Sequence, residues 1–439
     1  MTTAAATLNP PSGLRILALR FLGYLSADGL NYGLGFLIYG WLIRILTTQQ
    51  YGQLGVATSI YQPLMMIAAL GLDLTGVKLI RECGNCPSFA RKAQQLRLAV
   101  AGLICGPLEL GAALFAWHRG HDLLAVLILA SFSMVLARAL DLTYLAVALR
   151  APAPLARTRA LGLSVYLLLL VACTPAVRQH LWLVPVLNAI GVTLGRIRLG
   201  RLLRRLCPAS AGAAVTRSWQ IVVQGSKAGG GQLLLLVLQT GDVVLLARYV
   251  SGDALGQYAM VSRLYLLAMA VLAAMFNTFL PEIVQVAHDW RRLQNIFQTC
   301  ILANLGLGIA GGAAFCWLGA PIFELLGHRS LPLVHVISPV FALVFLLMSI
   351  ANPFLSILPS LKLGTGYFIG VASAALLLAG FDLTFIPRYG SVAAAWGQVL
   401  LTAYLAGFSI AAWLRHIRVL RSSSSRTVAD PLVAAESPW

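Results

Sequence analysis

Apolar residues occupy this chain in long blocks, many of them near the roughly 20 residues that a helix needs to cross a lipid bilayer. Of the 439 residues, 59% are apolar and only 10% are charged, and the mean hydropathy is +0.83. A soluble domain carries roughly 25% charged residues. The chain is therefore predicted to be an all-α integral membrane protein that crosses the membrane many times.

We predict about twelve transmembrane helices in two six-helix lobes. No basic region precedes the first apolar block and no cleavage site follows it, so we expect no removable signal peptide. The segment 1–15 is predicted to be cytoplasmic from the distribution of charge. The predicted organisation continues with a first lobe at 16–200, a basic cytoplasmic linker at 201–219, a second lobe at 220–414 and a cytoplasmic, disordered tail at 415–439. The approximate spans are 16–45, 53–77, 98–117, 122–149, 159–177, 181–197, 220–248, 254–280, 297–319, 332–358, 365–386 and 392–414.

The net charge of +18 is explained by where the basic residues lie relative to the predicted spans. If the N-terminus is cytoplasmic, the inside loops hold 23 Lys and Arg residues and the outside loops hold six. This bias is a strong positive-inside signal, and it places both termini in the cytoplasm. We therefore interpret the basic residues as a signal for the orientation of the chain in the cytoplasmic (inner) membrane. Anionic membrane lipids are a minor partner, and we expect no nucleic-acid site.

Two stretches of the sequence, 204 residues apart, share a pattern of residues. In each copy a glycine and a glutamine follow an arginine by eight and nine residues, and a tyrosine follows it by seventeen. Six predicted spans separate the copies, so the duplication is parallel, with a pseudo-two-fold axis along the membrane normal and a cavity between the lobes. We interpret the repeated residues as structural; they are Arg44, Gly52, Gln53 and Tyr61 in the first copy and Arg248, Gly256, Gln257 and Tyr265 in the second.

Three basic residues lie within predicted spans, where an ionisable group costs roughly 2.5–3.5 kcal/mol and is a functional candidate by default. Arg263, Lys227 and Arg138 could line the cavity between the lobes, where unpaired cations favour an anionic substrate such as a lipid-linked phosphate or pyrophosphate. Two structural alternatives stay open. Lys227 could extend its amine to water at the inner membrane face, and Arg138 could pair with Asp141 on the same helix face.

Asp28 and Asp141 are the candidate ion-coupling residues. Asp28 lies about twelve residues into the first span, roughly 18 Å deep, among polar residues that would face a cavity. A titrating or cation-binding carboxylate and a carboxylate satisfied by helix packing explain Asp28 equally well. Asp242, close to the outer end of the seventh span, could meet a cation from another helix.

The loops give no sign of a catalytic site. The outside loops have about 4–12 residues each, and no phosphate-binding loop of the form G-x-x-x-x-G-K-[ST] occurs in the chain. Cys83 and Cys86 have no second cysteine pair or nearby histidine to complete a zinc site, so we interpret them as incidental reduced thiols. We expect no enzymatic activity, no metal and no cofactor.

Particular residues around the two repeat copies resemble a known family. The segments Leu42-Ile43-Arg44-Ile45-Leu46, Tyr51-Gly52-Gln53-Leu54-Gly55 and Gly71-Leu72 resemble the first-to-second helix signature of polysaccharide flippases of the Wzx type. Asp242, Leu255-Gly256-Gln257-Tyr258, Ser262-Arg263-Leu264 and Pro281-Glu282 resemble the seventh-to-eighth helix region of the same family. This family belongs to the multidrug/oligosaccharidyl-lipid/polysaccharide exporter superfamily.

The resemblance implies that two six-helix lobes move a lipid-linked (undecaprenyl-pyrophosphate) oligosaccharide to the outer leaflet by alternating access, driven by an ion gradient. It implies a role in surface polysaccharide biosynthesis, of lipopolysaccharide or exopolysaccharide, with a polysaccharide polymerase and assembly proteins as candidate partners. One alternative is a multidrug or metabolite exporter of the same fold, whose cavity would be more acidic or aromatic. A more distant alternative is a membrane glycosyltransferase or ligase, which would need a cluster of catalytic carboxylates or histidines.

Overall fold

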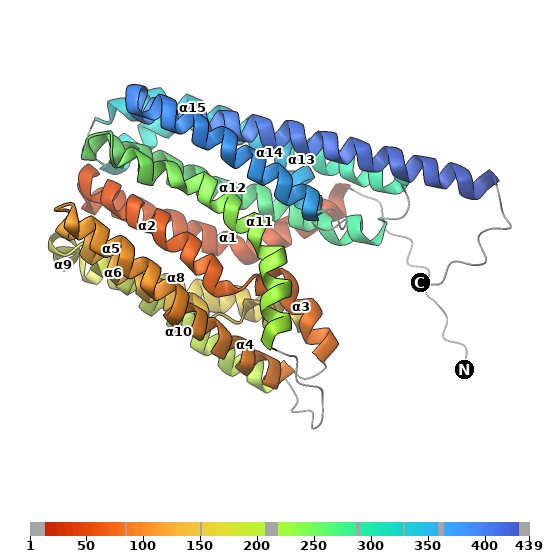
Figure 1. Ribbon diagram of the computed structural model, residues 1–439, viewed down its shortest axis with the longest axis horizontal. Helices are drawn as coiled ribbons and strands as arrows, with labels where there is room; N and C mark the ends of the chain where they lie inside the picture. Colours follow the sequence, from red (N-terminus) through yellow and green to blue (C-terminus); the bar gives the residue numbers. More distant parts are fainter. Residues whose placement is uncertain are drawn as a thin grey trace.

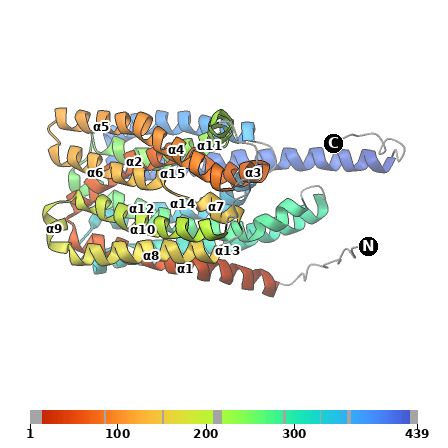
Figure 2. The same ribbon diagram turned by 90° about the horizontal axis from the view of Figure 1, so that it is seen from below.

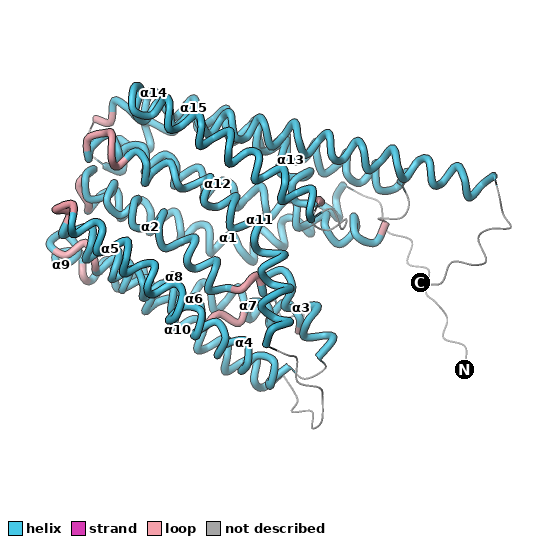
Figure 3. The backbone as a smooth tube through the Cα atoms, viewed as in Figure 1, coloured by secondary structure: helices cyan, strands magenta, loops and turns pink. Residues whose placement is uncertain are grey.

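The computed structural model describes residues 14–83, 86–149, 152–206, 218–286, 290–327, 330–358 and 364–429. Within these ranges the chain forms helices joined by short turns, and no strand is present (Figure 3). Nine helical stretches of the described chain are long and apolar enough to cross a membrane. The predicted all-α membrane architecture is therefore confirmed, whereas the number of twelve spans stays a prediction.

The first lobe extends to residue 206, and its long helices run roughly parallel (Figures 1 and 2). Its elements are α1 (Leu14–Ile45), α2 (Thr48–Ala69), α3 (Leu72–Cys83), α4 (Cys86–Val100), the π-helical turn η1 (Ala101–Cys105), α5 (Gly106–His118), α6 (Asp122–Ala139), α7 (Thr143–Ala148), α8 (Pro152–Ala172), α9 (Thr174–Gln179) and α10 (Leu183–Leu206). α2 begins with a capping box, in which Thr47 and Gln50 each bond the other's backbone N–H through their side chains.

The second lobe consists of α11 (Ser218–Leu246), α12 (Gly252–Gln285), α13 (Trp290–Gly327), α14 (Pro332–Ile357) and α15 (Gly364–Ala429). α15 contains two helical segments that meet at a kink at Gly390, where φ is 56° and ψ is −133°. The second segment remains helical to Ala429 and extends beyond the bundle (Figure 1). The helix therefore includes the first part of the segment 415–439, for which the sequence predicts a disordered tail.

Each end of the bundle has a distinct set of connections. We call the end that holds the short turns at 46–47, 119–121 and 247–251 the turn end. The opposite end, where α3 and α7 lie and α11 begins, is called the basic end, because the sequence places the excess of Lys and Arg there. The long axes of the two lobes diverge from the turn end toward the basic end (Figure 1).

Near the turn end, the two lobes meet where α2 packs against α12. A Cβ atom at Gly52 would lie 3.0 Å from the backbone nitrogen of Gly256, and one at Gly256 would lie 1.9 Å from the carbonyl oxygen of Thr48. Gly52 and Gly256 are the repeat-related glycines, so the repeat places the same residue type on both sides of the lobe interface. Only residues without a side chain let the two backbones approach this closely.

The repeated tyrosines, arginines and one of the repeated glutamines also occupy positions where they stabilise the fold. Tyr61 and Tyr265 are buried, and the side-chain carbonyl of Gln257 accepts a hydrogen bond of 2.9 Å from the backbone N–H of Leu333. Arg44 and Arg248 are exposed near the turn end, where an interfacial arginine is expected.

The predicted span 53–77 is interrupted between α2 and α3. Leu70 and Gly71 both have positive φ, 52° and 60°, so the helix ends there in left-handed backbone. A Cβ atom at Gly71 would lie 2.1 Å from the carbonyl oxygen of Gly225 on α11. The break in the helix therefore lies where the first lobe contacts the start of the second lobe.

Candidate functional site

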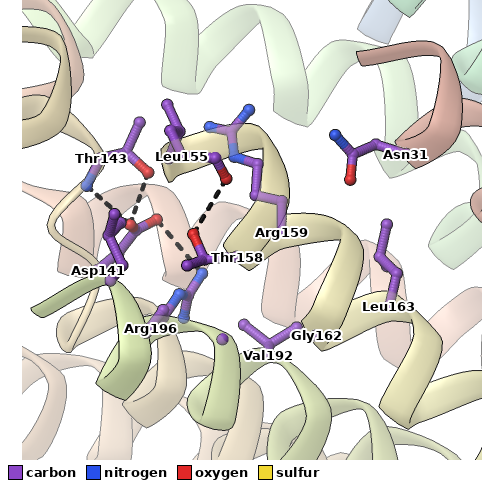
Figure 4. A pocket seen from close by; sticks show the side chains of 12 residues that line it. Asn31, Asp141, Thr143, Leu155, Thr158, Arg159, Gly162, Leu163, Val192 and Arg196 are labelled. Carbon is purple, nitrogen blue, oxygen red and sulfur yellow. Dashed lines mark hydrogen bonds and ion pairs between the residues drawn. The ribbon is translucent and has the colours of Figure 1, made fainter. Parts of the chain in front are cut away.

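A cavity of about 240 Å³ lies in the first lobe, in the half nearer the basic end. α8 and α10 form most of its wall, and Asn31 of α1 lies across from them (Figure 4). The polar side chains that line it include Arg159 and Thr158 from α8, Arg196 from α10, and Asp141 from the turn between α6 and α7. A single small cavity thus brings together basic, acidic and hydrogen-bonding groups at membrane depth.

Glycines fix the distance between the two helices that form the cavity wall. A Cβ atom at Gly191 would lie 2.5 Å from the carbonyl oxygen of Gly162, and one at Gly195 would lie 2.5 Å from that of Thr158. Gly191 and Gly195 are four residues apart on α10, the small-xxx-small spacing that allows close helix packing in membranes. This close crossing positions Arg196, the next residue, against the cavity.

Asp141 is the centre of an ion-pair cluster beside the cavity. Its carboxylate pairs with Arg138 and, at 3.3 Å, with Arg196. The other carboxylate oxygen accepts hydrogen bonds from the backbone N–H and the hydroxyl of Thr143, at 2.9 and 2.7 Å. Arg138 also pairs with Asp73 of α3, so the cluster connects three helices. The predicted pairing of Arg138 with Asp141 is confirmed.

Arg97 completes this cluster from α4, with its side chain fully buried. Its guanidinium donates hydrogen bonds to the carbonyl oxygens of Ala68, at 3.2 Å, of Arg138, at 2.9 Å, and of Asp141. It also lies over the ring of Tyr144, 5.8 Å from the ring centroid. The sequence analysis missed Arg97, because the predicted span began one residue after it.

The arginines of the cluster and cavity outnumber the acids. Arg97, Arg138, Arg159 and Arg196 face two aspartates, Asp73 and Asp141. One terminal nitrogen of Arg196, Nη1, is buried with no hydrogen-bond partner among the described residues. Arg159 is exposed at the cavity wall. A guanidinium with an unused donor beside a second guanidinium suits the oxygens of a phosphate or carboxylate.

A second group of polar residues lies in the other lobe and has the opposite character. Asp242 of α11 accepts hydrogen bonds from the hydroxyl of Tyr258, from Nε2 of Gln398 at 3.0 Å, and from the backbone N–H of Val243 at 2.8 Å. Asp382 of α15 is 5% exposed, and it lies close enough to Asp242 for the two carboxyl groups to interact electrostatically. Its Oδ1 atom has no hydrogen-bond partner in the described chain. Asp382 was not among the predicted site residues, although an acid inside the predicted span 365–386 is a functional candidate by default.

The structure does not bring the three predicted substrate-binding residues together. Arg263 lines a nearly closed space of about 10 Å³ at the interface of the two lobes, beside Ser59 of α2 and Thr240 of α11. Arg138 belongs to the ion-pair cluster in the first lobe instead. The side chain of Lys227 lies outside the described residues.

Three other predicted residues also lie outside what the structure describes. The side chains of Asp28, Cys83 and Cys86 are not among the described ones, so their roles stay predictions. Among the side chains that are described, no group of three or more His, Cys, Asp or Glu residues is arranged to hold a metal ion.

The comparison with known families gives one match. The model of a family described as "Polysaccharide biosynthesis protein" matches residues 21–287, which is more than half of the chain. A search of curated protein sequences gives no match.

Solved structures with a similar fold cover nearly the whole chain. A lipid II flippase, MurJ, in an inward closed conformation has a TM-score of 0.69 at 12% identity, covering 95% of this chain and 94% of its own. A multidrug resistance transporter of the MATE family and MOP superfamily, in an inward-facing conformation, has a TM-score of 0.65 at 12% identity, covering 93% and 99%. A MOP-superfamily transporter from Pyrococcus furiosus, described as having a binding pocket of reverse polarity, has a TM-score of 0.58 at 14% identity, covering 93% and 92%.

Proposed function

The chain belongs to the polysaccharide biosynthesis protein family, and we propose that it moves a lipid-linked oligosaccharide across the cytoplasmic membrane for surface polysaccharide synthesis. In this proposal the oligosaccharide is joined to its undecaprenyl carrier by a pyrophosphate. The fold that the chain shares with a lipid II flippase and with multidrug transporters supports a transport role.

The observation that carries the proposal is the excess of arginine around the cavity in the first lobe. A pyrophosphate is the group in such a substrate that most needs cations, because it is the charged part of a molecule that otherwise consists of sugar and hydrocarbon. Arg159 is exposed and Arg196 has an unused donor, so both can bind phosphate oxygens without breaking the ion pairs of Arg138. The sugar would then lie toward Asn31 and the space between the lobes, while the lipid tail stays in the bilayer.

The packing of the lobes supports alternating access. The glycine contacts between α2 and α12 close the interface near the turn end, and Arg263 lies in the small space that remains there. The lobes diverge toward the basic end, which the charge bias predicts to be cytoplasmic (Figure 1). This conformation would accept substrate from the cytoplasmic side, and separation of Gly52 from Gly256 would open the opposite side past Arg263.

The pair of buried acids in the second lobe is our candidate for ion coupling. Asp242 accepts hydrogen bonds from the neutral groups of Tyr258 and Gln398, and Asp382 interacts electrostatically with Asp242. The described chain shows no Lys or Arg paired with either acid. Two carboxyl groups close together in a low-dielectric interior are stabilised when a cation or proton binds between them. We therefore assign the driving ion to this pair in place of Asp141, whose charge the arginines already balance.

Deletion of the gene in the source cell tests the proposal. Lipid-linked repeat units should accumulate on the cytoplasmic face of the membrane, and a plasmid copy of the wild-type gene should restore surface polysaccharide. A copy with Arg159→Ala and Arg196→Ala should insert normally but fail to restore it, whereas Arg198→Ala, an exposed arginine on the same helix α10, should succeed. If the deletion strain accumulates no repeat units on the cytoplasmic side, the proposed function is wrong.

A multidrug exporter of the same fold is the second candidate, and the acidic pair in the second lobe is the one feature that favours it. The arginine excess in the cavity of the first lobe disfavours organic cations, the usual substrates of such exporters. Raised drug resistance on expression, with no effect on polysaccharide, would favour this candidate.

A further inference from the structure

One more acid lies inside the membrane, in a part of the first lobe that the proposed transport cycle does not use. Glu109 is on α5, within the apolar helical stretch Ser88–His118. It precedes the turn-end terminus of that stretch, His118, by nine residues, which places it roughly 14 Å deep and near the middle of the hydrocarbon core.

The carboxyl group of Glu109 is buried and has no hydrogen-bond partner in the part of the chain that the structure describes. The residue is 1% exposed, and neither carboxylate oxygen has a hydrogen-bond partner among the described residues. Leu108 and Leu110 on either side are about half exposed, so Glu109 faces the interior of the lobe rather than the lipid. The side chain is therefore directed to the place where an ionised carboxylate is least stable.

The groups near Glu109 do not neutralise its charge. The titratable neighbour is the thiol of Cys105, one turn earlier on the same helical stretch, which donates to the carbonyl oxygen of Leu64 on α2. Ser131 of α6, the helix that packs against α5, donates to the carbonyl oxygen of Leu127 on its own helix. From α2, α6 and η1, no Lys, Arg or His in the described chain acts on the carboxyl group.

The helix that carries Glu109 has a built-in irregularity immediately before it. Residues Ala101–Cys105 form the π-helical turn η1, and Pro107 follows at the start of α5. Proline lacks the N–H that would bond one turn back, so the regular ladder is interrupted at this point. Loss or movement of a π turn changes the helix register by one residue and rotates the residues after it by roughly 100°. Such a step can change the surroundings of Glu109 while α4 stays in place.

We propose that Glu109 is a proton-binding site in the middle of the membrane, protonated in the conformation described here and able to release its proton when α5 rotates relative to α4. The ligand is a proton rather than a metal cation, because among the described residues no second acid acts on the carboxyl group and no metal-ligating cluster includes it. The coupling of this proton to transport rests on the proposed function, whereas proton binding by itself does not.

Infrared spectroscopy of the purified protein in lipid nanodiscs tests proton binding directly. The C=O stretching band of protonated carboxyl groups at neutral pH should lose one component in Glu109→Gln. It should be unchanged in Glu324→Gln, a matched variant of a solvent-accessible glutamate on α13. An unchanged band in Glu109→Gln would overturn the proposal.

Thermal unfolding of the same variants provides a second test. Glutamine is neutral and nearly the same shape as a protonated glutamate, so Glu109→Gln should unfold within a few degrees of the wild type. A large loss of stability would show that the carboxylate is ionised and paired, and would also overturn the proposal.

Proteoliposomes separate the coupling from the proton site and from the proposed function. With a pH gradient across the vesicle membrane, wild-type protein should move lipid-linked oligosaccharide faster than without one. This difference should be smaller in Glu109→Gln, in which the acidic pair Asp242 and Asp382 is unchanged. If wild-type vesicles move no oligosaccharide, the proposed function fails while the infrared result stands. If the variant responds to the gradient as the wild type does, the coupling part is wrong.

Discussion

The ion-pair cluster of the first lobe and the acidic pair of the second lobe differ in the groups that surround their buried carboxyl groups. In the first lobe, Asp141 is surrounded by arginines, and its charge is balanced by direct ion pairs. In the second lobe, Asp242 is satisfied by hydrogen bonds from neutral groups, and Asp382 keeps an oxygen atom without a partner in the described chain. Asp141, Asp242 and Asp382 are all buried, so burial alone does not distinguish the two sites.

The difference indicates which charges are structural and which are available for binding. A cluster of ion pairs is destabilised when the loss of one partner leaves another charge buried and uncompensated. Acids held only by neutral groups can take up a proton or cation without breaking an ion pair. We therefore expect substitutions in the first cluster to lower stability, and substitutions in the acidic pair to lower transport.

The largest effect should come from Arg97→Ala. The change removes three hydrogen bonds to backbone carbonyls and one member of the buried cluster, so we expect a loss of about 3–5 kcal/mol in the free energy of unfolding. Thermal unfolding of the purified protein in nanodiscs measures it. Arg91→Ala, an exposed arginine on the same helix α4, is the control and should have little effect. If Arg97→Ala and Arg91→Ala are equally stable, the interpretation that the cluster stabilises the fold is wrong.

Matched substitutions should separate the two sites. Asp141→Asn leaves Arg196 without its ion pair and weakens that of Arg138, so it should lower the free energy of unfolding by roughly 2–3 kcal/mol. Asp242→Asn disturbs only neutral hydrogen-bond partners, so it should cost about 1–2 kcal/mol, less than Asp141→Asn, while transport loses its dependence on the driving ion. Thermal unfolding and a vesicle transport assay check both variants. The reverse order of stability would contradict the comparison.

Gly256→Ala tests the interface that joins the two lobes. The added Cβ atom would lie 1.9 Å from the carbonyl oxygen of Thr48, so α2 and α12 must separate. We expect a loss of roughly 1–3 kcal/mol in this conformation and slower transport. Gly241→Ala, where nothing lies within 4 Å of the added atom, is the control for helix propensity. If both variants behave alike, the close glycine contact is not important for closing the turn end.

Tyr258→Phe should have the smallest effect. The change removes one hydrogen bond to Asp242 and leaves those from Gln398 and Val243, so the free energy of unfolding should fall by about 1 kcal/mol. The transport rate can be measured at increasing concentrations of the driving ion. Tyr258→Phe should change the apparent affinity for the ion more than it changes the maximal transport rate. A change in maximal rate alone would indicate that Tyr258 acts on the movement of the lobes instead.

The sequence predicted the large features of the fold because they depend on local composition. Apolar blocks predicted membrane helices, and the offset of 204 residues marked the glycines that meet between α2 and α12. The break at Leu70 could not be predicted, because it depends on the distant contact between Gly71 and Gly225. The predicted disorder after residue 415 followed from polar composition, which does not by itself stop a long helix.

The candidate site was only partly predictable. The spacing of Arg138 and Asp141 indicated their ion pair, since residues three apart share a helix face. Arg196 lies at the inner end of the predicted span 181–197, and only the tertiary structure brings it to Asp141. Glu109 and Asp382 carried a signal that was passed over, because each is an acid inside a predicted span.

Reconstitution of the purified protein with a lipid-linked oligosaccharide tests the central claim most directly. The measured quantity is the fraction of oligosaccharide that a membrane-impermeant glycosidase can reach from outside the vesicles as a function of time. The account predicts that wild-type protein lets the protected fraction become accessible, and that Arg159→Ala with Arg196→Ala slows this while Arg198→Ala does not. Vesicles with wild-type protein that behave like protein-free vesicles would contradict it.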